Sequence, residues 1–425
     1  MMGPLRVLIT NNALAERKGT ELYVRDLAEA LLGSGHTPIV YSTEPGVVSA
    51  EIRAASVPVV TDLKSISSPP DIIHGHHHLE TMTALLRFPG VPAVYFCHGW
   101  TPWEECPPVF SRILRYVAVD QTCRDRLVFE HAIPEDRVAT VLNFVNLNLF
   151  PSRLPLPEKP ARALVLSNYA NPQTYLPAVH EACSLAGIPV DCIGSGVKRV
   201  SDQPGLEISR YDIVFAKARS ALEAMAVGAA VVLCDEAGLG PMVNSENFDR
   251  LRAINFGLRA LREPISAEAL LARLNQYDAA DAAAVSRKVR MTANIDSAIE
   301  FILSIYYDAI AEFKGQRALS DPVEELRQAS EYLRWISPHI KDIKHHAHDL
   351  TQALAEQSSK YSSSLTVDQI RDMADRLKST EAEVASIKRT LGWRLLSSYG
   401  IIKHRYLLPA YGRIRRTSDR DAPSG

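Results

Sequence analysis

Cysteine, one-sided charge and long hydrophobic runs are all scarce in this 425-residue sequence. The six cysteines are scattered without the spacing of zinc ligands, so we expect reduced thiols in a cytoplasmic protein. The formal net charge of −2 gives no reason to expect nucleic acid as a partner. No run of about 18 apolar residues and no signal peptide is present, so neither a membrane span nor export is expected.

Length and element order favour two domains followed by a tail. Roughly 100–200 residues form one domain, so the chain suffices for both. Strands and helices are predicted to alternate as far as residue 313, which is typical of an α/β fold with parallel sheets. Four prolines at 151–160 mark the boundary between the two domains.

The segment 211–235, YDIVFAKARSALEAMAVGAAVVLCD, predicts a strand, a turn, a helix and a second strand. Ser220 and Glu223 have the spacing of a capping box at the start of the helix. Ligands bind at the carboxyl ends of strands in open α/β sheets. The helix start, Lys217 and Arg219 suit a phosphate group, and Glu223 suits sugar hydroxyls. The alternative is a buried amphipathic helix whose glutamate is a cap.

The segment 220–228, SALEAMAVG, resembles the signature helix of nucleotide-sugar glycosyltransferases with the GT-B fold. The closest group is the retaining family 4 of these enzymes. The resemblance covers residues 5–313 and implies two Rossmann-like, doubly wound domains that face a cleft. It also implies that Glu223 holds the ribose hydroxyls of the donor nucleotide.

Two features depart from that family. Phe215 stands where the first of two glutamates is usual, and the segment 167–175 contains no basic residue where many members have an Arg and a Lys for the diphosphate. The loop between strand and helix is also shorter than usual. We therefore expect Lys217 and Arg219 to supply the positive charge for the phosphates.

The N-terminal part is similar to the first domain of the same enzymes. A strand at 6–10, a loop that ends in Gly19, and a helix form a phosphate-binding turn, with a plain surface loop as the alternative. The family usually has two adjacent glycines, whereas Lys18 precedes Gly19 here. A strand at 92–97 ends in His98, to which the resemblance assigns contacts with the donor sugar.

Four histidines lie within 74–78, HGHHH, at the end of a predicted strand. Neighbouring side chains of a strand point to opposite faces, so few of them could share one ion, and Glu80 is the nearest carboxylate. The family often has histidines there that face the cleft. We expect no metal and no cofactor besides the nucleotide-sugar substrate, since no Asp-x-Asp lies in a fitting place.

A proline-rich loop follows His98 and contains aromatic and acidic side chains. Trp100, Trp103, Glu104 and Glu105 suit a sugar acceptor, and they equally suit a loop that packs its own aromatic residues. In the second domain, a strand at 189–193 ends in Gly194-Ser195-Gly196. Glycines there would permit close approach of a phosphate or base, although Gly-x-Gly alone is a weak signal.

The last part of the chain predicts long helices. A helix at 294–318 is expected to cross back onto the first domain. Apolar residues at heptad spacing, interrupted by Pro338, predict a coiled coil over 319–392. Homo-oligomerisation through 322–392 and a hairpin within one chain are the two interpretations.

Basic and aromatic residues are concentrated near the C-terminus. The segment 384–418 contains eight Lys or Arg and no Asp or Glu, interleaved with Trp, Tyr, Leu and Ile. This pattern predicts an amphipathic helix that binds an anionic membrane surface through 384–416. We therefore expect a cytoplasmic protein that is peripheral on the inner face of the membrane.

These observations predict a glycosyltransferase that moves a sugar from a nucleotide sugar to a glycan or lipid-linked acceptor in cell-surface polysaccharide synthesis. By resemblance the reaction retains the anomeric configuration. A nucleotide-sugar epimerase and a non-catalytic scaffold are the alternatives. The expected parts are two Rossmann-like domains, a crossing helix, a coiled coil and a basic tail, at 1–155, 156–293, 294–318, 319–392 and 393–425. The expected site residues are His98, Lys217 and Glu223 for catalysis, and Gly19, Gly194, Gly196, Lys217, Arg219, Ser220 and Glu223 for the donor.

Overall fold

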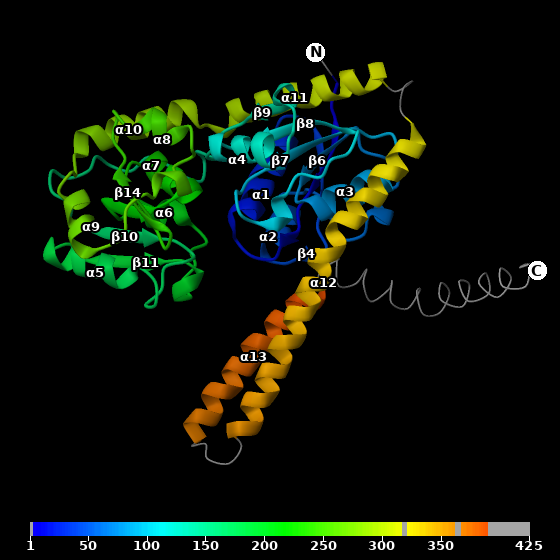
Figure 1. Cartoon of the computed structure of the whole chain (residues 1–425). Helices are drawn as coiled ribbons and strands as arrows, with labels where there is room; N and C mark the ends of the chain where they lie inside the picture. Colours follow the sequence, from blue (N-terminus) through cyan, green and yellow to red (C-terminus); the bar gives the residue numbers. More distant parts are fainter. Residues whose placement is uncertain (1–2, 317–320, 362–366, 390–425) are drawn as a thin grey trace, which may run out of the picture. The chain divides into compact units, whose positions relative to one another are not determined.

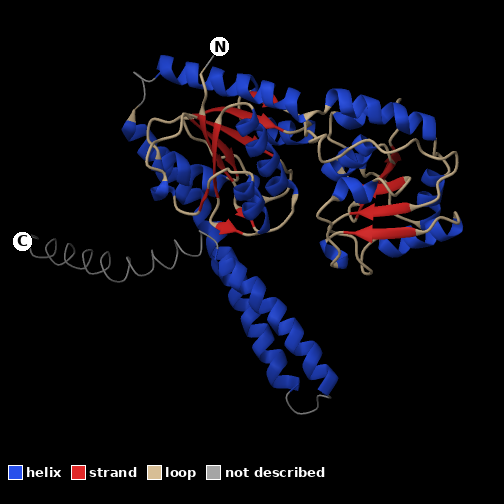
Figure 2. Cartoon of the chain, turned by 180° about the vertical axis from the view of Figure 1, so that it is seen from behind, coloured by secondary structure: helices blue, strands red, loops and turns tan. Residues whose placement is uncertain are grey.

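The computed structural model describes residues 3–316, 321–361 and 367–389. The chain divides into two compact units, Met1–Ser320 and Asp321–Gly425. All strands of the described residues lie in the first unit, where they form two large, mainly parallel sheets with helices on their faces and one two-stranded sheet (Figures 1 and 2).

A seven-stranded sheet is the centre of the first domain, in the order β5-β3-β1-β6-β7-β8-β9, with every pairing parallel. Its central strands are rich in apolar and aromatic residues without alternation, as is usual for strands that are buried on both faces. The strands are β1 (Arg6–Thr10), β3 (Thr37–Tyr41), β5 (Val59–Val60), β6 (Ile72–His76), β7 (Ala93–Cys97), β8 (Ile113–Ala118) and β9 (Val138–Thr140). The short strands β2 (Ala13–Leu14) and β4 (Glu44–Pro45) pair separately. The α-helices are α1 (Gly19–Gly33), α2 (Val47–Ala54), α3 (His78–Arg87) and α4 (Gln121–Asp125).

A five-stranded sheet forms the second domain, in the order β11-β10-β12-β13-β14. All pairings are parallel except that of β14 with β13. The strands are β10 (Ala163–Leu166), β11 (Val190–Ile193), β12 (Ile213–Ala216), β13 (Ala230–Asp235) and β14 (Gly238–Met242). The helices are α5 (Leu176–Leu185), α6 (Pro204–Ile208), α7 (Ala218–Val227), α8 (Phe248–Arg252), α9 (Ala267–Leu274) and α10 (Ala279–Thr292). Side chains of α5 and α9 pack in the core on one face of this sheet, and those of α6, α7 and α10 pack in the core on the other.

The helix α11 (Ile295–Gln316) returns the chain to the first domain. Its apolar residues, among them Ile299, Ile302 and Tyr306, belong to the same core as β1, β7 and α1. Where the chain re-enters, Asn294 forms an isolated β-bridge with Val145, so the two segments that join the domains lie side by side. Figure 1 shows α11 running along the first domain from this point.

The second unit contains two helices, α12 (Pro322–Tyr361) and α13 (Val367–Arg389). The sequence predicts an interruption at Pro338, but α12 continues through that residue. In both views of the chain α13 runs back along α12, as in the hairpin alternative (Figures 1 and 2). Association with a second chain stays a prediction. The basic segment beyond Arg389, which carries most of the predicted membrane contact, lies outside the described residues.

None of the helices within the described ranges has an apolar stretch of the length needed to cross a bilayer.

Candidate functional site

The second sheet has a topological switch point between β10 and β12. From β10 the chain passes through α5 to the edge strand β11, whereas from β12 it passes through α7 to β13 on the other side. The loops that follow the two neighbouring strands therefore diverge at the carboxyl ends of these strands. Ligands of open α/β sheets bind at such a place.

The turn from β12 into α7 is tighter than the sequence suggests. The helix starts at Ala218, with Lys217 at the N-cap position and no side-chain cap, so the predicted capping box at Ser220 is wrong. Ala218 has a positive φ of 48°, which costs energy for a residue with a Cβ atom. Its amide donates to Phe256 O at 2.9 Å, a contact that holds this conformation. Gly228, in the left-handed conformation, ends the helix.

Lys217 lies at the switch point with three side chains of the second domain. Its ammonium is 2.9 Å from Asp235 Oδ1 at the end of β13 and 4.8 Å from the centre of the Tyr169 ring. Ser167, at the end of β10, lies within 3.3 Å of the other oxygen of Asp235. The structure thus places Lys217 where a phosphate is expected, with its charge balanced by a buried aspartate.

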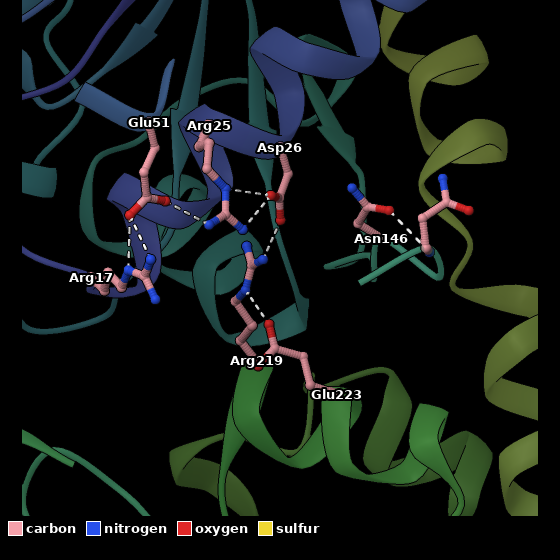
Figure 3. A network of polar contacts seen from close by, with 8 residues as sticks. Arg17, Arg25, Asp26, Glu51, Asn146, Arg219 and Glu223 are labelled. Atoms are coloured by element: carbon pink, nitrogen blue, oxygen red, sulfur yellow. Dashed lines mark hydrogen bonds and ion pairs between the residues drawn. The ribbon is translucent and has the colours of Figure 1, made fainter. Parts of the chain in front are cut away.

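Arg219 and Glu223 lie one turn apart on α7 and form an ion pair. Arg219 Nε donates to Glu223 Oε1 at 2.7 Å, and Arg219 Nη2 donates to Asp26 on helix α1 of the first domain. Burial alone would lower the pKa of Arg219, but Asp26 and Glu223 raise it above its usual value. Burial raises the pKa of Glu223 although Arg219 opposes the shift. One guanidinium therefore links a carboxylate of each domain (Figure 3).

The ion pairs continue from Asp26 along the first domain. Arg25 bonds both Asp26 and Glu51, at 2.7 and 3.0 Å. Arg17, in the loop before Gly19, lies 2.8 Å from Glu51 and 3.1 Å from Asp202 of the second domain. We call this set of seven side chains the charge chain: Glu223, Arg219, Asp26, Arg25, Glu51, Arg17 and Asp202. It crosses between the domains at both of its ends, and Figure 3 shows the part from Arg17 to Glu223.

The three predicted donor-site glycines differ in their surroundings. A Cβ on Gly194 would lie 1.9 Å from Ser167 O, and one on Gly196 would lie 2.4 Å from Ala170 O. The packing of one loop on another therefore requires glycine at both positions. A Cβ on Gly19, at the first residue of α1, would meet nothing within 4 Å.

His98 faces the same region from the first domain, at the carboxyl end of β7. Its ring stacks on that of His76, with 4.7 Å between centroids, and His76 packs at 4.6 Å from His74. Tyr23 of α1 meets His98 edge to face at 4.6 Å. Burial, with neighbouring His77 and Arg219, lowers the pKa of His98 to about 3, so the ring is neutral at physiological pH.

The loop after His98 folds on itself. Glu105 accepts the backbone N–H groups of His98 and Gly99, at 2.5 and 2.9 Å, and burial raises its pKa to about 7. The Trp103 ring packs against His78 at 4.2 Å. Glu105 therefore holds the turn that presents His98, whereas Trp103 packs on α3 and not within the loop.

Within the part of the chain that the structure describes, no three His, Cys, Asp or Glu side chains gather as a metal site. In the column of His74, His76 and His98, the rings of His76 and His98 are stacked and those of His74 and His76 are tilted, and the Tyr306 hydroxyl is 2.5 Å from His74 Nδ1.

Sequence reasoning missed Asp26 and Tyr23. Both lie on α1 at positions that repeat about every turn from Gly19, and Tyr23 belongs to the same core as Leu27 and Leu31. A fully buried aspartate on an amphipathic helix needs a cationic partner, and this one has two. The only local signal is that Asp26 follows the aromatic residue Tyr23 by three positions, on the helix that begins at Gly19.

Comparison with known proteins identifies the fold. Residues 17–149 match the sequence model of Glycosyltransferase Family 4. No curated protein is similar to the chain in sequence. A glycosyltransferase from Rickettsia africae ESF-5 is 14% identical with a TM-score of 0.52, over 73% of this chain and 99% of that one. HepE from Anabaena, solved with UDP and glucose, is 14% identical with a TM-score of 0.51, over 72% and 100%.

At these identities the structural likeness shows the fold. It agrees with the two sheets, the switch point and the returning helix described above. The chain has the GT-B fold, as predicted, and the match to Glycosyltransferase Family 4 is confined to residues 17–149.

Proposed function

We propose that this protein is a glycosyltransferase that transfers a sugar from a nucleotide sugar to a hydroxyl of a glycan or lipid-linked acceptor. The main observation behind the proposal is that Glu223, on helix α7 of the second domain, faces the part of the first domain that contains His98. Arg219 joins the two sides, because it bonds Glu223 and Asp26 and also affects the pKa of His98.

The donor nucleotide lies on the second domain. Glu223 accepts hydrogen bonds from the ribose hydroxyls through Oε2, because Oε1 is taken by Arg219. Lys217 and the N-terminus of α7 hold the diphosphate, which competes with Asp235 for the ammonium. His98, being neutral, donates or accepts a hydrogen bond at a hydroxyl of the donor sugar.

Transfer proceeds with retention of configuration. The bond between the anomeric carbon and the phosphate oxygen breaks, the bond to the acceptor oxygen forms on the same face, and the departing phosphate takes the acceptor proton. No side chain then needs to act as a base. The protein contributes positioning and charge stabilisation of the leaving diphosphate through Lys217.

The acceptor approaches from the first domain. A transfer of this kind would serve the synthesis of cell-surface polysaccharide. A lipid-linked acceptor would bring the substrate to the membrane surface that the basic segment 384–416 fits. That segment lies mainly outside the described residues, so the proposal rests there on sequence alone.

A non-catalytic nucleotide-binding or scaffold protein is the second candidate. It is favoured by the pairing of both donor-site cations with carboxylates, Lys217 with Asp235 and Arg219 with Asp26 and Glu223. A diphosphate meets less free positive charge here than in a site with unpaired basic residues.

The two candidates are separated by nucleotide binding and turnover. We would measure the thermal stabilisation of the full chain by UDP, GDP, ADP and their sugar conjugates, since a ligand of the native state raises its apparent stability. Binding of one nucleotide, weakened about tenfold or more in Glu223→Ala, would support the donor site. Hydrolysis or transfer of the matching nucleotide sugar would then support catalysis. Binding without turnover would favour the second candidate, and no binding would contradict the donor site.

A further inference from the structure

The charge chain has a strict alternation of sign. Four carboxylates alternate with three guanidinium groups from Glu223 to Asp202, so every cation in it lies between two anions. Alternation lowers the electrostatic cost of burying so many charges together. The Asp202 side chain at one end is 92% exposed, whereas Glu223 at the other end is 9% exposed. The buried end is the end at the predicted donor site.

Asp26 is the most enclosed member of this chain. Its side chain is completely buried, and its two oxygens are divided between Arg25 and Arg219. A buried carboxylate with both oxygens paired holds its partners in fixed positions, because moving either would leave a buried charge without compensation. Asp26 therefore restricts where the Arg219 guanidinium can lie.

Arg219 transmits this restriction to Glu223. It presents Nη2 to Asp26 and Nε to Glu223, and a guanidinium is planar, so fixing one of these contacts orients the other. Glu223 Oε1 is thereby held at 2.7 Å from Arg219. Glu223 Oε2 has no hydrogen-bond partner among the described residues and stays available for a ligand hydroxyl.

We infer that Asp26 is a positioning residue of the donor site: through Arg219, it orients Glu223 for the ribose hydroxyls, although it belongs to the opposite domain. The inference rests on the proposed function. Its consequence is that nucleotide affinity depends on contact between the two domains, since separating them removes Asp26 from Arg219. Donor binding and domain closure are then linked.

The test is a double-mutant cycle on nucleotide affinity in the full chain. The probe is the nucleoside diphosphate, among UDP, GDP and ADP, that stabilises the wild-type protein most. We expect Asp26→Asn to weaken its binding about tenfold, as is usual for coupled neighbours in one network. In the Glu223→Gln background the same change should weaken binding less than twofold, because the carboxylate that Asp26 positions is gone.

A matched control comes from a second ion pair between the same domains. Arg259 lies 2.5 Å from Asp125, and this pair contacts no member of the charge chain. Asp125→Asn removes an interdomain ion pair without touching Glu223, so its effect on nucleotide affinity should stay below twofold. Asp26→Glu, which keeps the carboxylate, should restore part of the affinity that Asp26→Asn loses.

Each other outcome has a defined meaning. If Asp26→Asn binds as wild type while Glu223→Gln binds weakly, the inference is wrong and the donor site stands. If Asp26→Asn weakens binding equally with and without Glu223, Asp26 has only a structural role and the inference is again wrong. If the wild-type protein binds none of the three, or if Glu223→Gln has no effect, the proposed function itself is contradicted.

Discussion

Lys217 is the residue on which the phosphate hypothesis depends most directly. The chain lacks the usual basic pair after the first strand of this domain, and Lys217 directly follows β12 at the switch point. Its contacts with Asp235 and Tyr169 hold the ammonium at the carboxyl end of β12. The ammonium of Lys217 is therefore already in position for a diphosphate, which would replace part of its contact with Asp235.

Replacing Lys217 should therefore weaken nucleotide binding selectively. We expect Lys217→Ala to lower the affinity for a nucleoside diphosphate roughly tenfold, as the loss of one charge-assisted contact implies. Lys198→Ala is the matched control, because Lys198 follows Gly194-Ser195-Gly196 and has no predicted phosphate contact. Titration calorimetry measures both. Equal losses in the two variants would refute the role of Lys217.

The sequence singles out Glu223, Lys217 and His98 as candidates because each lies in a recognisable local pattern, and their roles stay predictions. It cannot identify Asp26 or the pairing of Arg219, because those contacts join residues almost 200 positions apart in the chain. The capping box at Ser220 failed for a related reason. The tertiary contact of Ala218 with Phe256 overrides the local preference for a helix start.

Among the elements, the loop after β11 shows that its glycines are needed for packing against a neighbouring loop. The loop lies against the loop after β10, with Ser195 N donating to Asn168 Oδ1 at 3.0 Å. Gly194 makes this close approach possible, since any Cβ there would overlap the backbone of Ser167. The two glycines thus allow the two loops to pack together, whereas the sequence pattern suggests direct ligand contact.

A side chain at Gly194 should consequently destabilise the second domain. We expect Gly194→Ala to lower stability by about 1–3 kcal/mol, because the backbone must shift to admit the methyl group. Gly33→Ala is the control, since a Cβ there meets nothing within 4 Å and alanine favours the helix end of α1. Thermal unfolding compares the two. If the unfolding midpoint of Gly194→Ala were unchanged, the loop would accommodate the methyl group without loss of stability, and this prediction would be wrong.

Strands were the most predictable elements of the fold. The strand at 6–10 agrees with β1 because it is a continuous apolar run that is buried on both faces. Helix faces were less predictable, because α1 is covered on two sides. Leucine periodicity identifies the side on the sheet, where Leu27 and Leu31 are buried, but it gives no sign that Asp26 contacts Arg219 of the second domain.

At the scale of the whole molecule, the two domains are joined by charged contacts, and the first domain keeps neutral histidines inside. Burial lowers the pKa of His77 and His98 to about 3 and that of His74 and His76 well below the ordinary value of 6.5. Glu80 and Glu105 change in the opposite sense, because burial raises their pKa to about 7.

These shifts make stability depend on pH in opposite directions. Below about pH 6.5 the unfolded chain protonates the histidines while the folded protein keeps them neutral, so their contribution to stability falls as pH falls. Glu80 and Glu105 are protonated in the folded state up to about pH 7, so their contribution is complete below about pH 4.5 and is lost as pH rises through 7. The histidine contribution can be isolated by removing one ring.

His76 is the best choice, because neither of its ring nitrogens has a hydrogen-bond partner among the described residues and aromatic rings surround it. His76→Phe should therefore remain folded at pH 7.5 and should lose less stability than wild type on transfer to pH 5.5. The difference should be about 1.4 kcal/mol for each pH unit below 6.5. The thermal midpoints at the two pH values measure it, with exposed His180→Gln as the control that keeps the wild-type dependence. If His76→Phe and the wild-type protein lost the same stability, His76 would be protonated in the folded state. The interpretation of His74, His76 and His98 as neutral rings would then be wrong.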